Sequence, residues 1–261
     1  MGIINVTPDS FSDGGKYFDP LSAQRRASKL IDEGADVIDV GAQSTRPMSE
    51  ELEIEEELRR LKPALISIRK AHPDSIISVD TFNSEVADLA LSIGANWIND
   101  ISGGRRDPHI LKIVAESRCP FVLTHSRGTS QTMDQLTSYK DVTNDVYLGL
   151  LRRTDEALKA GVKPEQIIWD PGLGFAKTTE QNLILLNEIE TLSSKEFPIL
   201  LGPSRKRFIG SVLKKSNLNS RIWGTAAIAC RSASTNISML RVHDVGPIYQ
   251  TLQMAMAISK Y

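Results

Sequence analysis

The chain alternates amphipathic helical segments with short apolar runs. Asp19 predicts a helix start, because its side chain can cap the first turn and Pro20 is tolerated there. The following residues place apolar side chains on one helical face, at Ala23, Ala27, Leu30 and Ile31. Gly34 predicts the end of this helix, and an apolar run follows it. The same order recurs at residues 83–104, 107–128 and 143–172.

Eight short apolar runs predict strands at residues 2–6, 36–42, 76–81, 97–102, 121–125, 167–171, 199–203 and 237–243. Most of them are nearly continuous in apolar residues, which is typical of strands buried on both faces of a parallel sheet. Because helical patterns separate the runs, the chain predicts right-handed βαβ units. Eight such units in a chain of roughly 250 residues favour an α/β fold of the (β/α)8 TIM-barrel type. We expect a single domain over residues 1–261.

A doubly wound dinucleotide-binding fold is the alternative. It predicts a G-x-G-x-x-G motif between the first strand and the first helix, and the sequence has none there. The nearest string, GLGFAK at Gly172–Lys177, lacks the third glycine and comes late in the chain. The barrel is therefore favoured.

Composition excludes several classes of function. The chain has 261 residues, of which 41% are hydrophobic and 24% charged, and a formal net charge of -1. A balanced charge without a basic block argues against a nucleic-acid partner. Since there is neither an apolar run of membrane-spanning length nor a signal-peptide pattern, we expect a cytoplasmic protein without a membrane partner. Cys119 and Cys230 lie among apolar residues and predict buried, reduced thiols.

Polar residues follow nearly every predicted strand. In a barrel these strand ends meet at one mouth, where the active sites of such folds lie. Asp80, Asn99 and Asp170 are short acceptors that suit a ligand with clustered N–H donors, such as the guanidine-like edge of a heterocycle. A turn or an internal hydrogen bond is the alternative for each of them alone. Together they predict a polar site at the mouth.

Two later strand ends carry basic residues. The string GPSRKR follows the seventh strand, and Ser204, Arg205 and Lys206 with nearby backbone N–H groups predict an anion or carbonyl site. Arg241 and His243 alternate along the eighth strand, so we expect both to point to one side, where they suit a phosphate. The chain has no H-E-x-x-H, C-x-x-C, Walker A or G-x-S-x-G motif, which disfavours a histidine-built metal site and a serine hydrolase.

Seven strings taken together resemble the dihydropteroate synthases, the folate-pathway members of the pterin-binding barrel family. In chain order they are GIINVTPDSFSDGG, DVGAQSTRP, SVDTF, INDISGG, DPGLGF, GPSRKR and RVHD. The resemblance implies condensation of 6-hydroxymethyl-7,8-dihydropterin pyrophosphate with 4-aminobenzoate, which gives 7,8-dihydropteroate and pyrophosphate. It implies Mg2+ as cofactor, a dissociative loss of pyrophosphate, and a homodimer formed through the late helices. The apolar stretch 248–258 fits a dimer contact or a helix that faces the core.

The same resemblance implies roles for single residues. Catalytic roles fall to Lys206, Asp80, Asp170, Asp13 and Phe11, with Phe11 and Asp13 on a first loop that closes over the reacting methylene. Asp80, Asn99 and Asp170 would hold the pterin, and Lys206 its carbonyl side. Asn5 would contact Mg2+ and, with Arg241 and His243, the pyrophosphate. Thr45, Arg46, Pro47 and Ser204 would shape the aminobenzoate pocket, where sulfonamides compete. Gly202 and Phe175, in the matched strings, complete the substrate-binding set.

Two alternatives share the expected pterin contacts. A methyltetrahydrofolate methyltransferase-type barrel would not need the STRP, SRK and RVH strings, which this chain contains. A non-catalytic pterin-binding paralogue would keep the pocket and lose the loops, whereas the first loop is intact in this sequence. Both are disfavoured by these strings.

Overall fold

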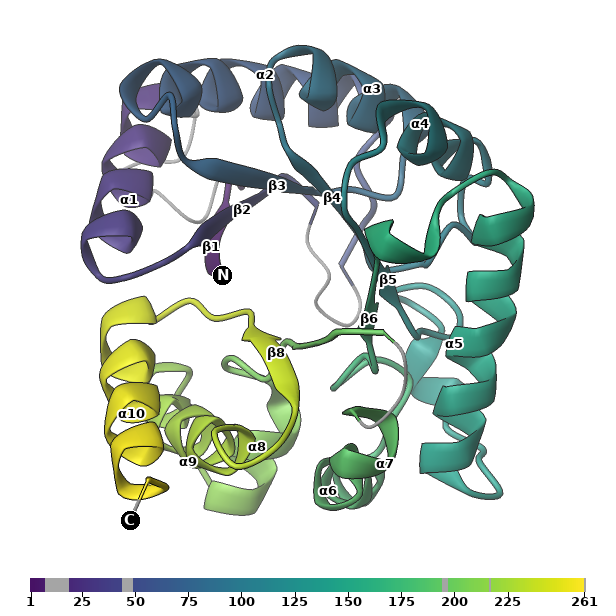
Figure 1. Ribbon diagram of the computed structural model, residues 1–261, viewed down its shortest axis with the longest axis vertical. Coiled ribbons are helices and arrows are strands. Elements are labelled where there is room, and N and C mark those ends of the chain that lie inside the picture. The colour runs from purple at the N-terminus through teal and green to yellow at the C-terminus, as the bar shows by residue number, and fades with distance from the viewer. Residues whose placement is uncertain (8–18, 44–48, 194–196, 216, 261) are drawn as a thin grey trace.

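Eight parallel strands form one sheet whose spatial order, β1 to β8, is the order of the sequence (Figure 1). The computed structural model describes residues 1–7, 19–43, 49–193, 197–215 and 217–260. The strands are β1 (Gly2–Asn5), β2 (Val37–Gly41), β3 (Ile76–Asp80), β4 (Trp97–Asp100), β5 (Phe121–Thr124), β6 (Ile167–Asp170), β7 (Ile199–Leu201) and β8 (Ile237–Leu240). All eight predicted strands are present, and each ends earlier than predicted.

The sheet closes on itself between its first and last strands. Gly2 pairs in parallel with Val242, just beyond β8. Ile3 N donates to Val242 O (2.9 Å), and Val242 N donates to Met1 O (2.9 Å). With every neighbouring pair parallel, this closure confirms the predicted (β/α)8 barrel, and the doubly wound alternative is wrong.

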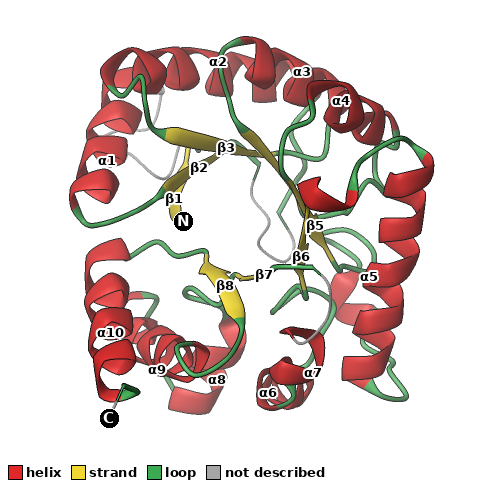
Figure 2. Ribbon diagram, viewed as in Figure 1, coloured by secondary structure: helices red, strands yellow, loops and turns green. Residues whose placement is uncertain are grey.

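Helices surround the strands as an outer ring (Figure 2). The α-helices are α1 (Pro20–Asp32), α2 (Ile54–Ala71), α3 (Ser84–Ser92), α4 (His109–Ser117), α5 (Val142–Lys159), α6 (Thr179–Asn187), α7 (Ile189–Ser193), α8 (Arg207–Leu213), α9 (Ile222–Ser232) and α10 (Val245–Ile258). Short 3-10 turns lie at η2 (Met133–Gln135), η3 (Pro164–Gln166) and η4 (Asn219–Arg221). The predicted start of α1 is confirmed, because the Asp19 carboxylate accepts from Leu21 N (3.0 Å).

The barrel interior changes from apolar to polar within one layer. Met1, Val37, Val122 and Leu200 form an apolar cluster low in the barrel. Successive side chains of a strand point to opposite faces, so the inward-facing residue comes back every second position. Two residues further along stand the polar side chains of Asp39 on β2 and Thr124 on β5. This alternation lifts polar groups to the carboxyl ends of the strands.

The structure bears on the expectations for the two cysteines and for a membrane-spanning helix. Cys119 is buried as predicted, but Cys230 is exposed, because it lies on the outer surface of α9, so that part of the expectation is wrong. Within the described residues, no helix is both long and apolar enough to cross a membrane.

Candidate active site

The centre of the mouth is an ion-paired cluster whose members come from four strands. Arg241, just after β8, donates from Nε to Asp39 Oδ2 (2.6 Å) and from its second guanidinium nitrogen to Asp80 Oδ2 (2.5 Å). Asn99 on β4 donates to the same oxygen of Asp39 (3.2 Å). Burial raises the pKa of Asp80 to about 7, and the Arg241 guanidinium opposes that shift. The cluster joins Asp80 and Asn99, as predicted, to a residue that the sequence analysis missed.

That residue, Asp39, is fully buried on β2. Its other oxygen, Oδ1, has no hydrogen-bond partner, and neither has the buried Thr124 Oγ1 on β5. Buried polar atoms are nearly always hydrogen-bonded, so each of these calls for a partner such as a ligand or water. A carboxylate inside the apolar run DVIDVGA was the available signal for Asp39.

Asp170 ends β6 and is held by the turn that follows it. Its Oδ1 accepts from Gly172 N (2.8 Å). A side chain at Gly202 would begin 3.8 Å from the other carboxylate oxygen, so Gly202 lies beside Asp170. Burial raises the pKa of Asp170, while the Gly172 hydrogen bond and the Lys206 charge lower it. The Asp170 carboxyl is thus buried, oriented and close to a cation.

Lys206 is the basic residue of its string that faces the site. Arg205 forms an ion pair with Asp244 (2.6 Å), and Arg207 forms one with Asp134 (2.5 Å). The Lys206 Nζ lies 4.0 Å from the centroid of the Phe175 ring. Burial lowers the pKa of Lys206 to about 8, and Asp170 opposes this shift. Lys206 and Phe175, both predicted as site residues, therefore lie in contact.

Ser204 and His243 form a second polar contact of the mouth. Ser204 Oγ lies 3.0 Å from His243 Nδ1 and accepts from His243 N (3.1 Å). Arg241 and His243 lie on either side of Val242, which pairs with Gly2 just beyond the end of β8, and the two side chains take different hydrogen-bond partners. That both point to one side stays a prediction. Burial, assisted by Arg241 and Arg205, lowers the pKa of His243 to about 3.

We therefore expect His243 to make folding sensitive to acid. Between pH 6.5 and about 3 the unfolded chain binds a proton at this position and the folded chain does not, so stability falls as pH falls through that window. Urea unfolding at pH 5, 6 and 7 gives the slope of the free energy of unfolding against pH. His243→Gln should reduce that slope by up to about 1.4 kcal/mol per pH unit. The exposed His109 supplies the control, and an unchanged slope in His243→Gln would contradict the assignment.

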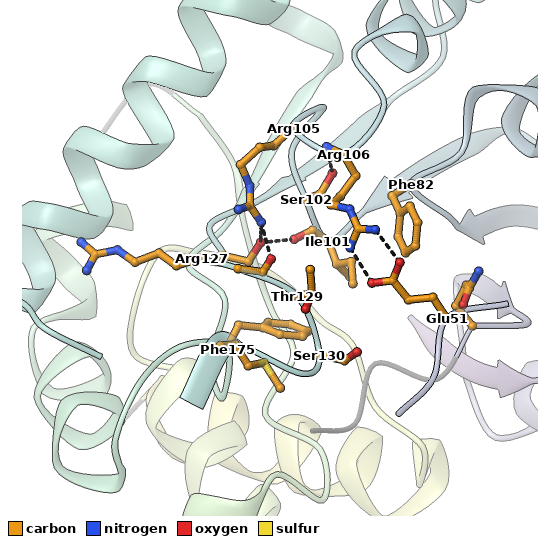
Figure 3. A pocket seen from close by; sticks show the side chains of 14 residues that line it. Glu51, Phe82, Ile101, Ser102, Arg105, Arg106, Arg127, Thr129, Ser130 and Phe175 are labelled. Carbon is orange, nitrogen blue, oxygen red and sulfur yellow. Dashed lines mark hydrogen bonds and ion pairs between the residues drawn. The ribbon is translucent and has the colours of Figure 1, made fainter. Parts of the chain in front are cut away.

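A pocket opens at the same mouth, beside Phe175 (Figure 3). Phe82, Ile101, Met133 and Phe175 supply apolar lining. Arg106 forms a two-point ion pair with Glu51 (2.6 and 2.5 Å) across its edge. Arg105 donates to Ser126 Oγ (3.2 Å) and Gly128 O (2.8 Å), whereas Arg127 points away from the cavity. The sequence analysis missed Arg105 and Arg106.

Asn5 ends β1 beside Gly41 of β2, at the same rim. Among the described residues no group of three acidic, histidine or cysteine side chains could hold a metal ion. The remaining predicted site residues, Phe11, Asp13, Thr45, Arg46 and Pro47, lie outside the described residues.

Comparison with known proteins agrees with this geometry. Residues 1–243 match the pterin-binding enzyme family. A dihydropteroate synthase of Synechocystis is 45% identical over 99% of this chain and 89% of its own length. A folic acid synthesis protein of Pneumocystis carinii is 44% identical over all of this chain, which spans 36% of that longer protein.

A solved structure extends the similarity to three dimensions. The dihydropteroate synthase of Xanthomonas albilineans, determined with 4-aminobenzoic acid, is 37% identical and superposes with a TM-score of 0.93. The match covers all of this chain and 92% of the other. Family match, full-length identity and common fold agree with the site at the mouth, and the chain belongs to the dihydropteroate synthases of the pterin-binding enzyme family.

Proposed function

We propose that the site joins 6-hydroxymethyl-7,8-dihydropterin pyrophosphate to 4-aminobenzoate, giving 7,8-dihydropteroate and pyrophosphate. The observation that carries this proposal is the grouping of Asp80, Asn99 and Asp170 around one barrel mouth, with Lys206 beside Asp170. Carboxylates accept paired N–H donors of the kind that a pterin edge presents. The bound 4-aminobenzoic acid of the Xanthomonas enzyme supports the second substrate.

The chain's residues divide the work between the two ends of the pterin substrate. Asp170 and Asn99 accept N–H groups of the pyrimidine edge, and the Lys206 ammonium donates to its carbonyl side. Asp80 takes part in the same recognition while it holds Arg241. Phe175 supplies a flat apolar surface beneath Lys206. The pterin is thereby fixed with its pyrophosphate toward Asn5, Arg241 and His243.

The departing pyrophosphate needs positive charge that is already in place. Arg241 is held by two carboxylates and remains a cation at every physiological pH. The neutral His243 can donate one hydrogen bond. The C–O bond to pyrophosphate breaks and leaves a pterin-stabilised cation. The neutral aromatic amine attacks its methylene carbon, and the new C–N bond is left neutral when the nitrogen gives one proton to the departed pyrophosphate. Ser204, with Thr45, Arg46 and Pro47, would place the amine, and Phe11 and Asp13 would exclude water.

The residues present fit a loosely held Mg2+. Mg2+ keeps several waters and binds through one or two protein oxygens plus substrate phosphates. The Asn5 side-chain amide offers such an oxygen at the rim, so a larger acidic cluster is not required. When bound, Mg2+ would supply charge to the pyrophosphate.

We further propose a cytoplasmic homodimer in which residues 1–261 of each copy form one domain. On α10 only Val245 and Ile248 are buried, while Met254 and Ile258 are about 62% and 63% exposed. The core-facing explanation of stretch 248–258 therefore fails for the second half of the helix. Its exposed apolar surface, with Trp223 of α9, supports a contact with a second copy.

Release of pyrophosphate tests the proposed reaction. The protein with Mg2+ and dihydropterin pyrophosphate should release pyrophosphate and form dihydropteroate in equal amounts when 4-aminobenzoate is added. Tight binding of the pterin without release would instead support a non-catalytic paralogue. Methyl transfer from methyltetrahydrofolate, with no condensation, would support the methyltransferase-type barrel.

A further inference from the structure

A buried lysine, Lys177, connects the ends of β5 and β6 beneath the site, and the proposed reaction leaves it without a role. Its Nζ lies 3.0 Å from Gly172 O, 3.1 Å from Phe175 O and 3.2 Å from His125 Nδ1. An ammonium group has three N–H donors and no acceptor. Burial lowers the pKa of Lys177 to about 7, and the Asp170 charge opposes that shift. In its ammonium form the group has one acceptor for each N–H, although the side chain is only 7% exposed.

The first acceptor belongs to the turn that orients Asp170. Gly172 N donates to Asp170 Oδ1, and Gly172 O accepts from Lys177. Gly172 has φ +70°, and a Cβ there would lie 1.9 Å from His125 O. The turn thus packs directly on the end of β5, and a lateral movement of Gly172 would carry the Asp170 carboxyl with it.

The second acceptor belongs to the residue beneath Lys206. Phe175 O accepts from Lys177, and the Phe175 ring lies 4.0 Å from the Lys206 Nζ. Asn182 of α6 fixes the same loop from outside, because its Oδ1 accepts from Gly174 N (2.7 Å). Lys177 therefore contacts the backbone at both ends of the segment that places Asp170 and Phe175.

The third acceptor is itself immobile. His125 is buried at the end of β5 and packs against Gly149 of α5, where a Cβ would lie 2.6 Å from the imidazole Cδ2. Burial, and then the Lys177 charge, lower the pKa of His125. The ring is therefore neutral at physiological pH, and its Nδ1 can accept from the ammonium.

We infer that Lys177 is a positioning residue for pterin binding: anchored on His125, it holds the Gly172–Phe175 turn and through it the Asp170 carboxyl and the Phe175 ring. The inference rests on the proposed function, because it assigns the pterin to Asp170. It predicts that loss of Lys177 weakens the pterin site selectively.

Lys177→Met tests this, since methionine keeps the length and apolar contacts of the side chain but removes all three donors. We expect the KM for dihydropterin pyrophosphate to rise at least tenfold and the KM for 4-aminobenzoate to change less than threefold. The Kd of dihydropterin pyrophosphate measured without 4-aminobenzoate should rise in parallel. A lower Tm with both KM values unchanged would overturn the inference, because it would show a structural role only.

Gln166→Met is the matched control. Gln166 is also buried beside β6 and donates to two backbone carbonyls, Val114 O (2.9 Å) and Cys119 O (2.8 Å), but at the opposite end of the strand. This variant should lose stability and keep both KM values. An equal rise in the pterin KM would show that any buried donor at β6 has this effect, against a specific role for Lys177.

A pair of variants at His125 keeps the inference testable if Lys177→Met does not fold. His125→Asn places an amide oxygen close to the position of Nδ1, whereas His125→Leu offers no acceptor. We expect the asparagine variant to keep the pterin KM within threefold and the leucine variant to raise it as Lys177→Met does. Equal pterin KM values for the two variants would contradict the anchoring of Lys177 on His125. Turnover by the unmodified protein in the same assay tests the proposed function separately.

Discussion

Arg241→Met is expected to abolish turnover and to destabilise the fold at the same time. The substitution leaves Asp39 and Asp80 buried without their shared cation. Breaking a buried ion pair by removing one partner costs about 3–5 kcal/mol, because the remaining charge is uncompensated. The proposed loss of the cation at the pyrophosphate should lower kcat by a factor of at least about 10³. Urea unfolding and pyrophosphate release measure the two effects.

The destabilisation should depend on pH in a defined direction. The pKa of Asp80 is already raised by burial to about 7, and removing Arg241 raises it further. Between the unfolded and folded pKa values the folded state binds the additional proton, so stability falls as pH rises through that window. The difference in free energy of unfolding between Arg241→Met and the unmodified protein should therefore be larger at pH 8 than at pH 6. Equal differences at the two pH values would contradict the ion pairing of Arg241 with Asp80.

A second substitution separates stability from activity. Asp39→Asn, added to Arg241→Met, removes one of the unpaired carboxylates and still offers Asn99 an acceptor. The double variant should recover part of the lost stability and none of the turnover. Arg59→Met is the surface control, because the Arg59–Glu56 ion pair lies on the exposed face of α2 and should contribute nothing measurable.

The positions of the strands and of the mouth could be predicted because they follow from local pattern. A continuous apolar run can only be buried on both faces, and the polar residue after it must then lie at the rim. Asp80, Asn99 and Asp170 were found in this way. The pairing of Val242 with Met1 and Ile3 across the closure could not be predicted, because a local pattern does not contain it.

Partners far apart in the sequence could not be predicted. Arg241 and Asp39 are separated by 202 positions, and their contact depends on closing the barrel. Lys177 is part of the string GLGFAK that the sequence analysis considered. Its role could not be predicted, because its three acceptors belong to His125 after β5 and to a turn whose conformation the sequence does not specify. Arg105 and Arg106 are typical of a solvated surface until the loops beside them form a cavity wall.

Lys206→Met should remove activity and leave the fold intact, unlike Arg241→Met, which should affect both. Loss of one preorganised donor commonly lowers kcat by about 10²–10³, and the proposed bond to the pterin carbonyl adds a loss of affinity. Folding should tolerate the change, because the ammonium is held in a buried place that already lowers its pKa to about 8. Methionine fills a similar volume and makes favourable contacts with the Phe175 ring.

The pH dependence of this variant identifies the group. In the unmodified protein the Lys206 ammonium deprotonates above pH 8, so kcat/KM should fall there, and Lys206→Met should lack that limb. Between pH 8 and 10.5 the unfolded chain holds the proton more tightly, so this lysine makes stability rise with pH, and the variant should lose that rise. Lys112→Met, on the exposed face of α4, should change neither profile. Normal turnover by Lys206→Met, or its failure to fold, would show that Lys206 has been assigned the wrong role.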